Sequence, residues 1–209
     1  MTSAIVVTGA DTDVGKTVFA AALVAALGAA YWKPIQAGLA SPTDSESVAR
    51  LSAAAPPRIL REAYRLVLPA SPHFAAEQES IVIDPERLRL PAVEGTLVVE
   101  GAGGALVPIT RTLLFADLMA EWQAPVVIVA RTALGTINHS LLTIEALRAR
   151  NVPLLGIAFV GDANADSERT ICEIGRVKRL GRLPRLERLE TDALAAAFAA
   201  DFRTGDFAG

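Results

Sequence analysis

The chain has 209 residues, of which 52% are hydrophobic and only 5% aromatic, and its formal net charge at pH 7 is −3. This acidic balance excludes a general basic surface for nucleic acid, and no apolar run reaches the roughly 18 residues that span a bilayer. A single cysteine, Cys172, excludes an internal disulfide and a cysteine metal cluster. The N-terminus lacks a basic region followed by an apolar stretch. We therefore expect one cytoplasmic domain over residues 1–209, with no nucleic-acid or membrane partner.

Short β-branched runs alternate with longer helical patterns along the chain, which predicts successive βαβ units. Strands are predicted at 4–8, 30–34, 96–100, 126–130, 154–160 and 179–183. Helices are predicted at 16–27, 45–54, 115–122, 138–150, 167–177 and 192–202. Residues 56–91 hold six of the twelve prolines and are expected to form a surface excursion rather than a second domain. The fold class is therefore α/β, a mostly parallel sheet with helices on both faces.

The segment TGADTDVGKT, residues 8–17, lies between the first predicted strand and the first predicted helix. Its glycines allow backbone N–H groups to surround phosphate oxygens, and the helix N-terminus favours an anion. Lys16 is expected to reach the β- and γ-phosphates, and the Thr17 hydroxyl a Mg²⁺ ion. Gly9 and Gly15 enclose five residues where the usual pattern has four. The alternative is a chance Gly-Lys-Thr turn, but the flanking strand and helix favour a phosphate loop, and with it a P-loop NTPase fold.

Polar residues also follow two later strands. Lys33 stands between Trp and Pro at a strand end, where burial requires a neutralising anion, unless the side chain reaches the surface. Glu100 ends an apolar strand and is expected to help hold Mg²⁺, or else to cap the following turn. Asp44 could bind the metal or cap the next helix, and local physics does not separate these roles. Asp13, inside the loop, is a third candidate metal ligand.

The remaining polar candidates carry weaker signals. His73 and His139 have no convincing catalytic context, and structural roles are expected for both. Cys172 is expected to be a small apolar filler in a helix. The predicted helix start at Asn138 offers free backbone N–H groups as a second anion site.

Four motifs together resemble one family, the dethiobiotin synthetases. They are residues 8–17, KPIQAG at 33–38, VEGAGG at 99–104 and LGTINH at 134–139, and they occur in the family's order. SPH at 71–73 and LGRLP at 180–184 add weaker support. The resemblance therefore extends from residue 1 to about residue 185.

The resemblance implies roles for particular residues. The implied catalytic residues are Lys33 and Lys16, and the implied metal ligands are Thr17, Asp44 and Glu100. The implied nucleotide-binding residues are Asp13, Val14, Gly15, Lys16, Thr17, Val18, Asp44, Glu100, Gly101, Ala102, Gly103, Gly161, Asp162, Leu183 and Pro184. The implied substrate-binding residues are Ala37, Thr136, Ile137 and Asn138. An aspartate shortly after the Lys-Pro motif is a metal and nucleotide ligand in that family, which favours this role for Asp44, although Glu46 is close enough to compete.

The implied reaction joins 7,8-diaminopelargonate, CO₂ (or bicarbonate) and ATP, and it yields dethiobiotin, ADP and phosphate. It passes through a carbamate and a carbamic-phosphoric anhydride, both anionic, and Lys16, Lys33 and Mg²⁺ would supply fixed positive charge. The family also implies a homodimer, in which the substrate carboxylate meets the backbone amides of 136–138 from a neighbouring subunit.

Two positions depart from what some family members show. Ala37 replaces a serine or threonine that touches substrate, which leaves only its backbone N–H. Gly161-Asp162 stands where an asparagine often reads adenine, so base recognition is expected to fall to the Gly161 backbone and to Asp162 or Asn164. The alternative function is a partitioning-type ATPase switch, but its signature lysine position is occupied here by Asp11.

Overall fold

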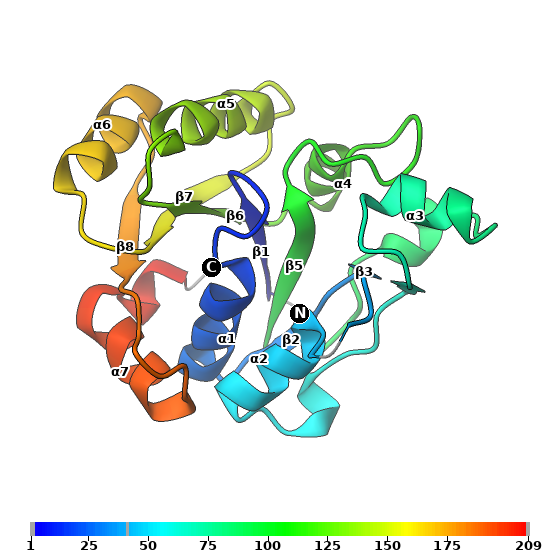
Figure 1. Ribbon diagram of the computed structural model, residues 1–209, viewed down its shortest axis with the longest axis horizontal. Helices are drawn as coiled ribbons and strands as arrows, with labels where there is room; N and C mark the ends of the chain where they lie inside the picture. The colour runs from blue at the N-terminus through cyan, green and yellow to red at the C-terminus, as the bar shows by residue number, and fades with distance from the viewer. Residues whose placement is uncertain (1–2, 41, 208–209) are drawn as a thin grey trace.

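The computed structural model describes residues 3–40 and 42–207. Its main sheet has six parallel strands in the order β2-β5-β1-β6-β7-β8 (Figure 1). These strands are β1 (Ser3–Gly9), β2 (Ala30–Trp32), β5 (Thr96–Gly104), β6 (Val126–Arg131), β7 (Leu154–Val160) and β8 (Arg179–Leu183). A second, two-stranded parallel sheet pairs β3 (Ile35–Ala37) with β4 (Tyr64–Leu66).

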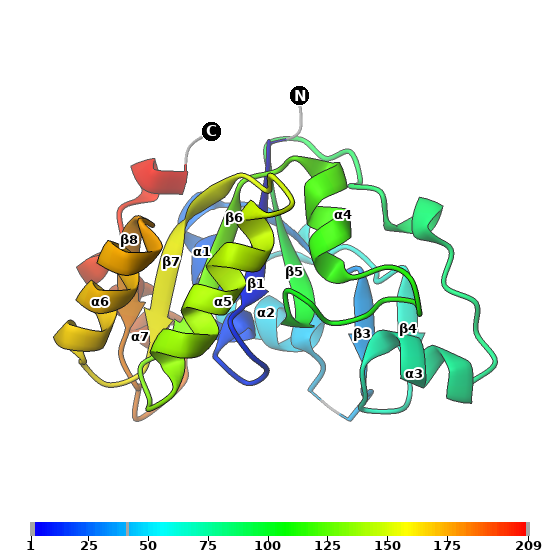
Figure 2. The same cartoon turned by 90° about the horizontal axis from the view of Figure 1, so that it is seen from above.

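Helices cover both faces of the main sheet (Figures 1 and 2). One face packs against α4 (Phe115–Trp122), α5 (Thr136–Arg148) and α6 (Ala165–Gly175). The opposite face packs against α1 (Lys16–Leu27), α2 (Asp44–Ser52) and α7 (Thr191–Asp201). The remaining elements are α3 (Pro72–Gln78) and the 3₁₀ turns η1 (Pro56–Arg58), η2 (Pro85–Leu88) and η3 (Thr204–Phe207). Within residues 3–40 and 42–207, no helix has both the length and the apolar character that crossing a membrane requires.

Helix α1 is an alanine-rich helix that lies close against the sheet. Each residue from 19 to 24 is at most 1% exposed. The helix begins after Gly15, whose φ of 93° is left-handed, and a Cβ there would lie 2.8 Å from Val160 Cγ1. Both the backbone conformation and the available space therefore require glycine. As a result, the helix N-terminus stands directly at the end of β1.

Most predicted elements are confirmed, and several bounds are corrected. Helices α1 and α4 and strands β7 and β8 have the predicted bounds. The bounds of β1, β6, α2, α6 and α7 differ from the predicted ranges by one or two residues at one or both ends, and α5 both begins and ends two residues early. Strand β5 continues to Gly104, which pairs with Gly9, instead of ending at residue 100. The predicted strand 30–34 ends at Trp32, because Pro34 lacks an N–H for the ladder and the chain moves into the second sheet as β3.

Residues 56–91 are more structured than the predicted surface excursion. They contain β4, α3 and two 3₁₀ turns, and Leu66, Ala75 and Leu88 are fully buried. Pro56, Pro72 and Pro85 begin short helical segments here, where the missing N–H costs no hydrogen bond. Cys172 is only partly buried, and it packs against the edge of the core on α6.

An aromatic cluster fastens the C-terminal segment to α1. The Phe19 ring lies 5.6 Å from that of Phe202 and 6.2 Å from that of Phe198, and Phe19 is fully buried. Phe19→Ala is therefore expected to lower the free energy of unfolding by about 3 to 5 kcal/mol in urea denaturation. Phe74→Ala, at a side chain 42% exposed, is the control and should cost about 0.5 kcal/mol or less. Equal losses in the two variants would contradict an anchoring role for the cluster.

Candidate functional site

A cavity of about 790 Å³ opens at the C-terminal ends of β1 and β5. Parallel sheets place ligands at this edge. The phosphate loop forms one wall, and residues 69–72 and Ala37 form another. Lys33, Asp44 and Glu100 also line the cavity. The structure thus brings three separate sequence motifs together in one place.

The phosphate loop folds back on its own lysine. Lys16 is 7% exposed, and its Nζ donates to the Asp11 carbonyl at 3.1 Å. Gly9 must be glycine, because a Cβ would lie 2.5 Å from that carbonyl oxygen. Burial lowers the pKa of Lys16, although attraction to Glu100 opposes the shift. An anion in the cavity would restore a favourable environment for this ammonium group.

Lys33 is buried, so the alternative of a side chain that reaches the surface is wrong. It is 3% exposed, and its Nζ lies 2.7 Å from Asp44 Oδ2 and 3.4 Å from Glu100 Oε1. Burial by itself lowers the pKa of Lys33, but attraction to Glu100 and Asp44 reverses this, and the pKa is raised overall. Lys33 therefore stays charged beside the cavity.

Glu100 connects three elements of the site. It is fully buried, its Oε1 accepts from the Thr17 hydroxyl at 2.8 Å, and its Oε2 accepts from the Tyr31 hydroxyl at 2.9 Å. Burial and the nearby Glu100 charge raise the pKa of Tyr31 well above its usual value, so the phenol keeps its proton. Tyr31 was missed at the sequence level. The sequence feature that could have identified it is a tyrosine within an apolar strand, because a buried hydroxyl needs a hydrogen-bond partner.

The structure separates the roles of Asp44 and Glu46. Thr43 is the N-cap of α2, and the Glu46 carboxylate accepts from the Thr43 N–H at 2.7 Å to complete a capping box. Asp44 is the first helical residue, and its Oδ1 lies 3.0 Å from Thr17 Oγ1. Burial tends to raise the pKa of Asp44, but contact with Lys33 holds it below the usual value. Asp44 thus faces the cavity, and Glu46 stabilises the helix.

The other loop residues divide between the cavity and the core. Asp13, Val18, Ala102 and Gly103 line the cavity, whereas Val14 is buried beneath the loop. Gly101 is also buried, and its carbonyl accepts from Lys33 Nζ at 3.4 Å.

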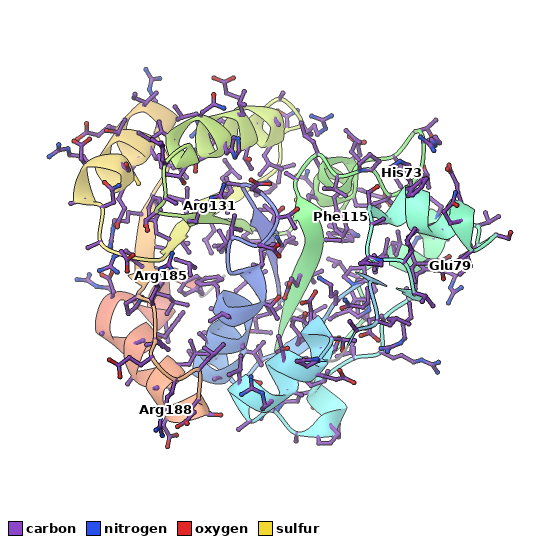
Figure 3. The ribbon with its side chains drawn as sticks, viewed as in Figure 1. His73, Glu79, Phe115, Arg131, Arg185 and Arg188 are labelled. Carbon is purple, nitrogen blue, oxygen red and sulfur yellow. The ribbon has the colours of Figure 1, made fainter. Side chains whose placement is uncertain are left out.

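The predicted base-reading residues lie at the ends of β7 and β8. The Gly161 N–H donates to the Leu183 carbonyl at 2.9 Å, and its carbonyl accepts from Arg182 at 2.9 Å. Both backbone groups of Gly161 are therefore engaged within the chain. Asp162 is exposed and pairs with Arg185, which is labelled in Figure 3, at 3.4 Å. Asn164 caps α6 by accepting from the Ser167 N–H at 3.1 Å, while Pro184 is exposed.

The start of α5 is also close to the phosphate loop. Among the described residues, those that line the cavity do not include the first residues of α5. The helix begins after Gly135, whose φ is 91°. Thr136 is buried, Ile137 is partly buried and Asn138 is exposed. In the next turn, His139 Nδ1 lies 3.3 Å from Asp11 Oδ2.

Asp11 therefore ties the loop to its surroundings within one chain. Besides His139, it faces Arg131, labelled in Figure 3, whose Nη2 lies 3.6 Å from Asp11 Oδ2. Its Oδ1 accepts from the Thr12 N–H at 2.7 Å. His139 thus has a charged partner on the loop, which supports the structural role expected for it.

A related fold is found among solved structures. A ParA family ATPase from Chlorobium tepidum has a TM-score of 0.51 to this chain at 12% identity, over 97% of this chain and 91% of that one. An identity this low shows the shared fold alone. The fold is therefore that of the P-loop NTPases, as the sequence predicted.

Sequence comparisons identify the family. Residues 3–193 match a family described as an AAA domain. The chain is 64% identical over 207 residues to the ATP-dependent dethiobiotin synthetase BioD of Rhodopseudomonas palustris (strain BisB5), covering 99% of this chain and 98% of that protein. It is 64% identical over 208 residues to the protein of the same name from Rhizorhabdus wittichii, covering 100% of both. With such similarity along its whole length, the chain belongs to the ATP-dependent dethiobiotin synthetase family.

Proposed function

We propose that residues 1–209 form one cytoplasmic ATP-dependent ligase domain that closes a ureido ring. Its substrates are 7,8-diaminopelargonate, CO₂ and ATP, and its products are dethiobiotin, ADP and phosphate. The observation that carries the proposal is a second buried lysine, Lys33, paired with Asp44 at 2.7 Å beside the phosphate loop. Lys16 already serves the phosphates, and a second buried cation beside it suits an anionic intermediate that forms next to the γ-phosphate.

The chain's own groups account for the successive steps. One substrate amine adds to CO₂ and loses a proton to become a carbamate, whose oxygen attacks the γ-phosphate and displaces ADP. The second amine then attacks the carbamic-phosphoric anhydride, phosphate leaves, and the attacking nitrogen releases a proton to solvent as the ring closes. Lys16 and the loop amides hold the phosphates, and Lys33 neutralises the carbamate and the departing phosphate. Ala37 contributes a backbone N–H to the substrate wall of the cavity.

The oxygens around Thr17 fit a magnesium ion. Thr17 Oγ1 lies 2.8 Å from Glu100 Oε1 and 3.0 Å from Asp44 Oδ1, yet a hydroxyl has only one proton to donate. Three hard oxygen atoms with one shared proton suit Mg²⁺, which takes its remaining ligands from phosphate and water. When bound, the ion would neutralise phosphate charge.

The substrate carboxylate needs positive potential away from the triphosphate. We propose that the amides of Thr136, Ile137 and Asn138 supply it from a second copy of the chain. Among the residues that the structure describes, the cavity lining of one chain includes none of those at this helix start, which supports a homodimer. So does the apolar surface near it, where Leu106 is 49% exposed and Leu142 56% exposed.

Nucleotide contacts are proposed to extend from the loop to the ends of β7 and β8. The phosphate end involves Asp13 to Val18 and Gly101 to Gly103. The Gly161 N–H and the Leu183 carbonyl are engaged with each other, and Leu183 is buried, so base contacts fall mainly to the exposed Asp162 and Pro184, with Leu183 supporting Pro184 from below. The alternative, a partitioning-type ATPase switch, is disfavoured because Asp11 stands at its lysine position and pairs with His139 of its own chain.

Replacement of Lys33 tests the catalytic role. Lys33→Ala is expected to lower turnover by about 100-fold or more, while ATP affinity changes little, because Lys33 faces charges that develop during the reaction. Turnover is measured as ADP release with diaminopelargonate and bicarbonate, and ATP affinity by calorimetry. Lys178→Ala, at a side chain 55% exposed and paired with Asp206, is the matched control. Near wild-type turnover of Lys33→Ala would exclude the role.

Replacement of Asn138 tests the carboxylate site. Asn138→Pro removes a backbone N–H from the first turn of α5, so the KM for diaminopelargonate is expected to rise more than in Asn138→Ala. The KM for ATP should stay near its wild-type value in both variants. Sedimentation velocity checks the dimer at assay concentrations. A fully active monomer would refute the shared site.

A further inference from the structure

Glu62 is a buried acid, and it is not among the described residues that line the cavity. It is 8% exposed and stands two residues before β4. Its Oε1 accepts from the Ser45 hydroxyl at 2.6 Å, and its Oε2 accepts from Arg65 at 3.1 Å. A buried carboxylate is costly unless its oxygens are satisfied. Glu62 is therefore firmly held, and it in turn holds Ser45.

Ser45 is adjacent to Asp44 in the first turn of α2, and a second contact holds the same turn. Gln36 on β3 is 6% exposed, and its Oε1 accepts from the Asp44 N–H at 3.3 Å. Its Nε2 donates to the Gly38 carbonyl at 3.0 Å, which fixes the orientation of the amide.

Glu62 and Gln36 come from one structural unit. Strands β3 and β4 pair in parallel, with Gln36 opposite Arg65, and Glu62 lies immediately before this pairing. The capping box of Thr43 and Glu46 fixes how α2 begins. This capping box does not set the distance from α2 to Thr17 on α1 or to Glu100 on β5. Val48 and Leu51 pack α2 into the core that includes α1 and set where the helix as a whole lies. The contacts from the small sheet hold its first turn, where Asp44 stands.

We propose that Glu62, acting through Ser45 and together with Gln36, positions Asp44 for the magnesium–nucleotide site. Glu62 is thus a positioning residue for a carboxylate that it does not touch. The inference rests on the proposed function, since it concerns the role of Asp44 there. Glu62 gives a cleaner test than Gln36, because Gln36 also lines the cavity and could contact substrate directly.

The test measures ATP binding by calorimetry across a series of Mg²⁺ concentrations. Glu62→Ala and Ser45→Ala should each raise the Mg²⁺ concentration for half-maximal binding by about tenfold, the usual effect of losing support behind a metal ligand. The double variant should resemble the single variants, because both remove the same contact. Glu62→Gln can direct its amide oxygen to Arg65 and donate an amide N–H to the Ser45 hydroxyl, so it keeps the contact with Ser45 and should stay close to wild type. ATP binding without Mg²⁺ should be unchanged in all of them.

The matched control is Glu77→Ala, which removes an acid that is 42% exposed and pairs with Arg111. It should leave the Mg²⁺ dependence unchanged. An unchanged Mg²⁺ dependence in Ser45→Ala and Glu62→Ala, with or without a lower melting temperature, would overturn the positioning role. If Glu62→Ala does not fold, Ser45→Ala compared with Glu62→Gln decides the question. Wild-type ATP binding that ignores Mg²⁺ would instead refute the metal site, and absent ring closure in the ADP-release assay would refute the proposed function.

Discussion

The structure depends on keeping two buried ammonium groups together with one buried and one partly exposed carboxylate at the edge of the cavity. Lys16 and Lys33 supply the positive charges, and Glu100 and Asp44 the negative charges. Removal of one member leaves a partner's charge without compensation, which costs far more than the pair contributes in place. Each residue around this group is therefore constrained in position as well as in type. The Tyr31 hydroxyl on Glu100 Oε2 shows how completely the available lone pairs are used.

The order of the strands explains how distant residues meet. Strand β5 lies between β2 and β1, so Glu100 stands between the lysine that follows β2 and the loop that follows β1. Because the sheet is parallel, all three strand ends reach the same edge. Asp44 comes from outside this arrangement, at the start of α2, and so it needs support from the small sheet of β3 and β4. The four charged side chains thus come partly from the central sheet and its phosphate loop and partly from a peripheral helix.

The sequence predicted the central part better than the peripheral part. Lys16 belongs to a phosphate-loop pattern, and Lys33 and Glu100 stand at the ends of predicted apolar strands, so all three charges are visible without coordinates. The choice between Asp44 and Glu46 required geometry, since both are acids in the first turn of one helix. Tyr31, Gln36 and Glu62 were missed because their partners are distant in sequence or depend on the second sheet. Strands β3 and β4 have three residues each, too few for a periodic pattern, so this sheet left no signal.

The burial of α1 has a consequence for how the protein opens locally. Residues 19–24 of this helix have almost no exposed surface, so their amide hydrogens can exchange with solvent only when the helix leaves the sheet. Helix α2 has nine residues, of which two are exposed and three partly exposed, and it can detach at a lower free energy. A ligand that contacts both helices links a stable unit to a less stable one. The gain in protection from hydrogen exchange on binding should therefore be concentrated in α2 and the small sheet, with little change in the helix that carries the phosphate loop.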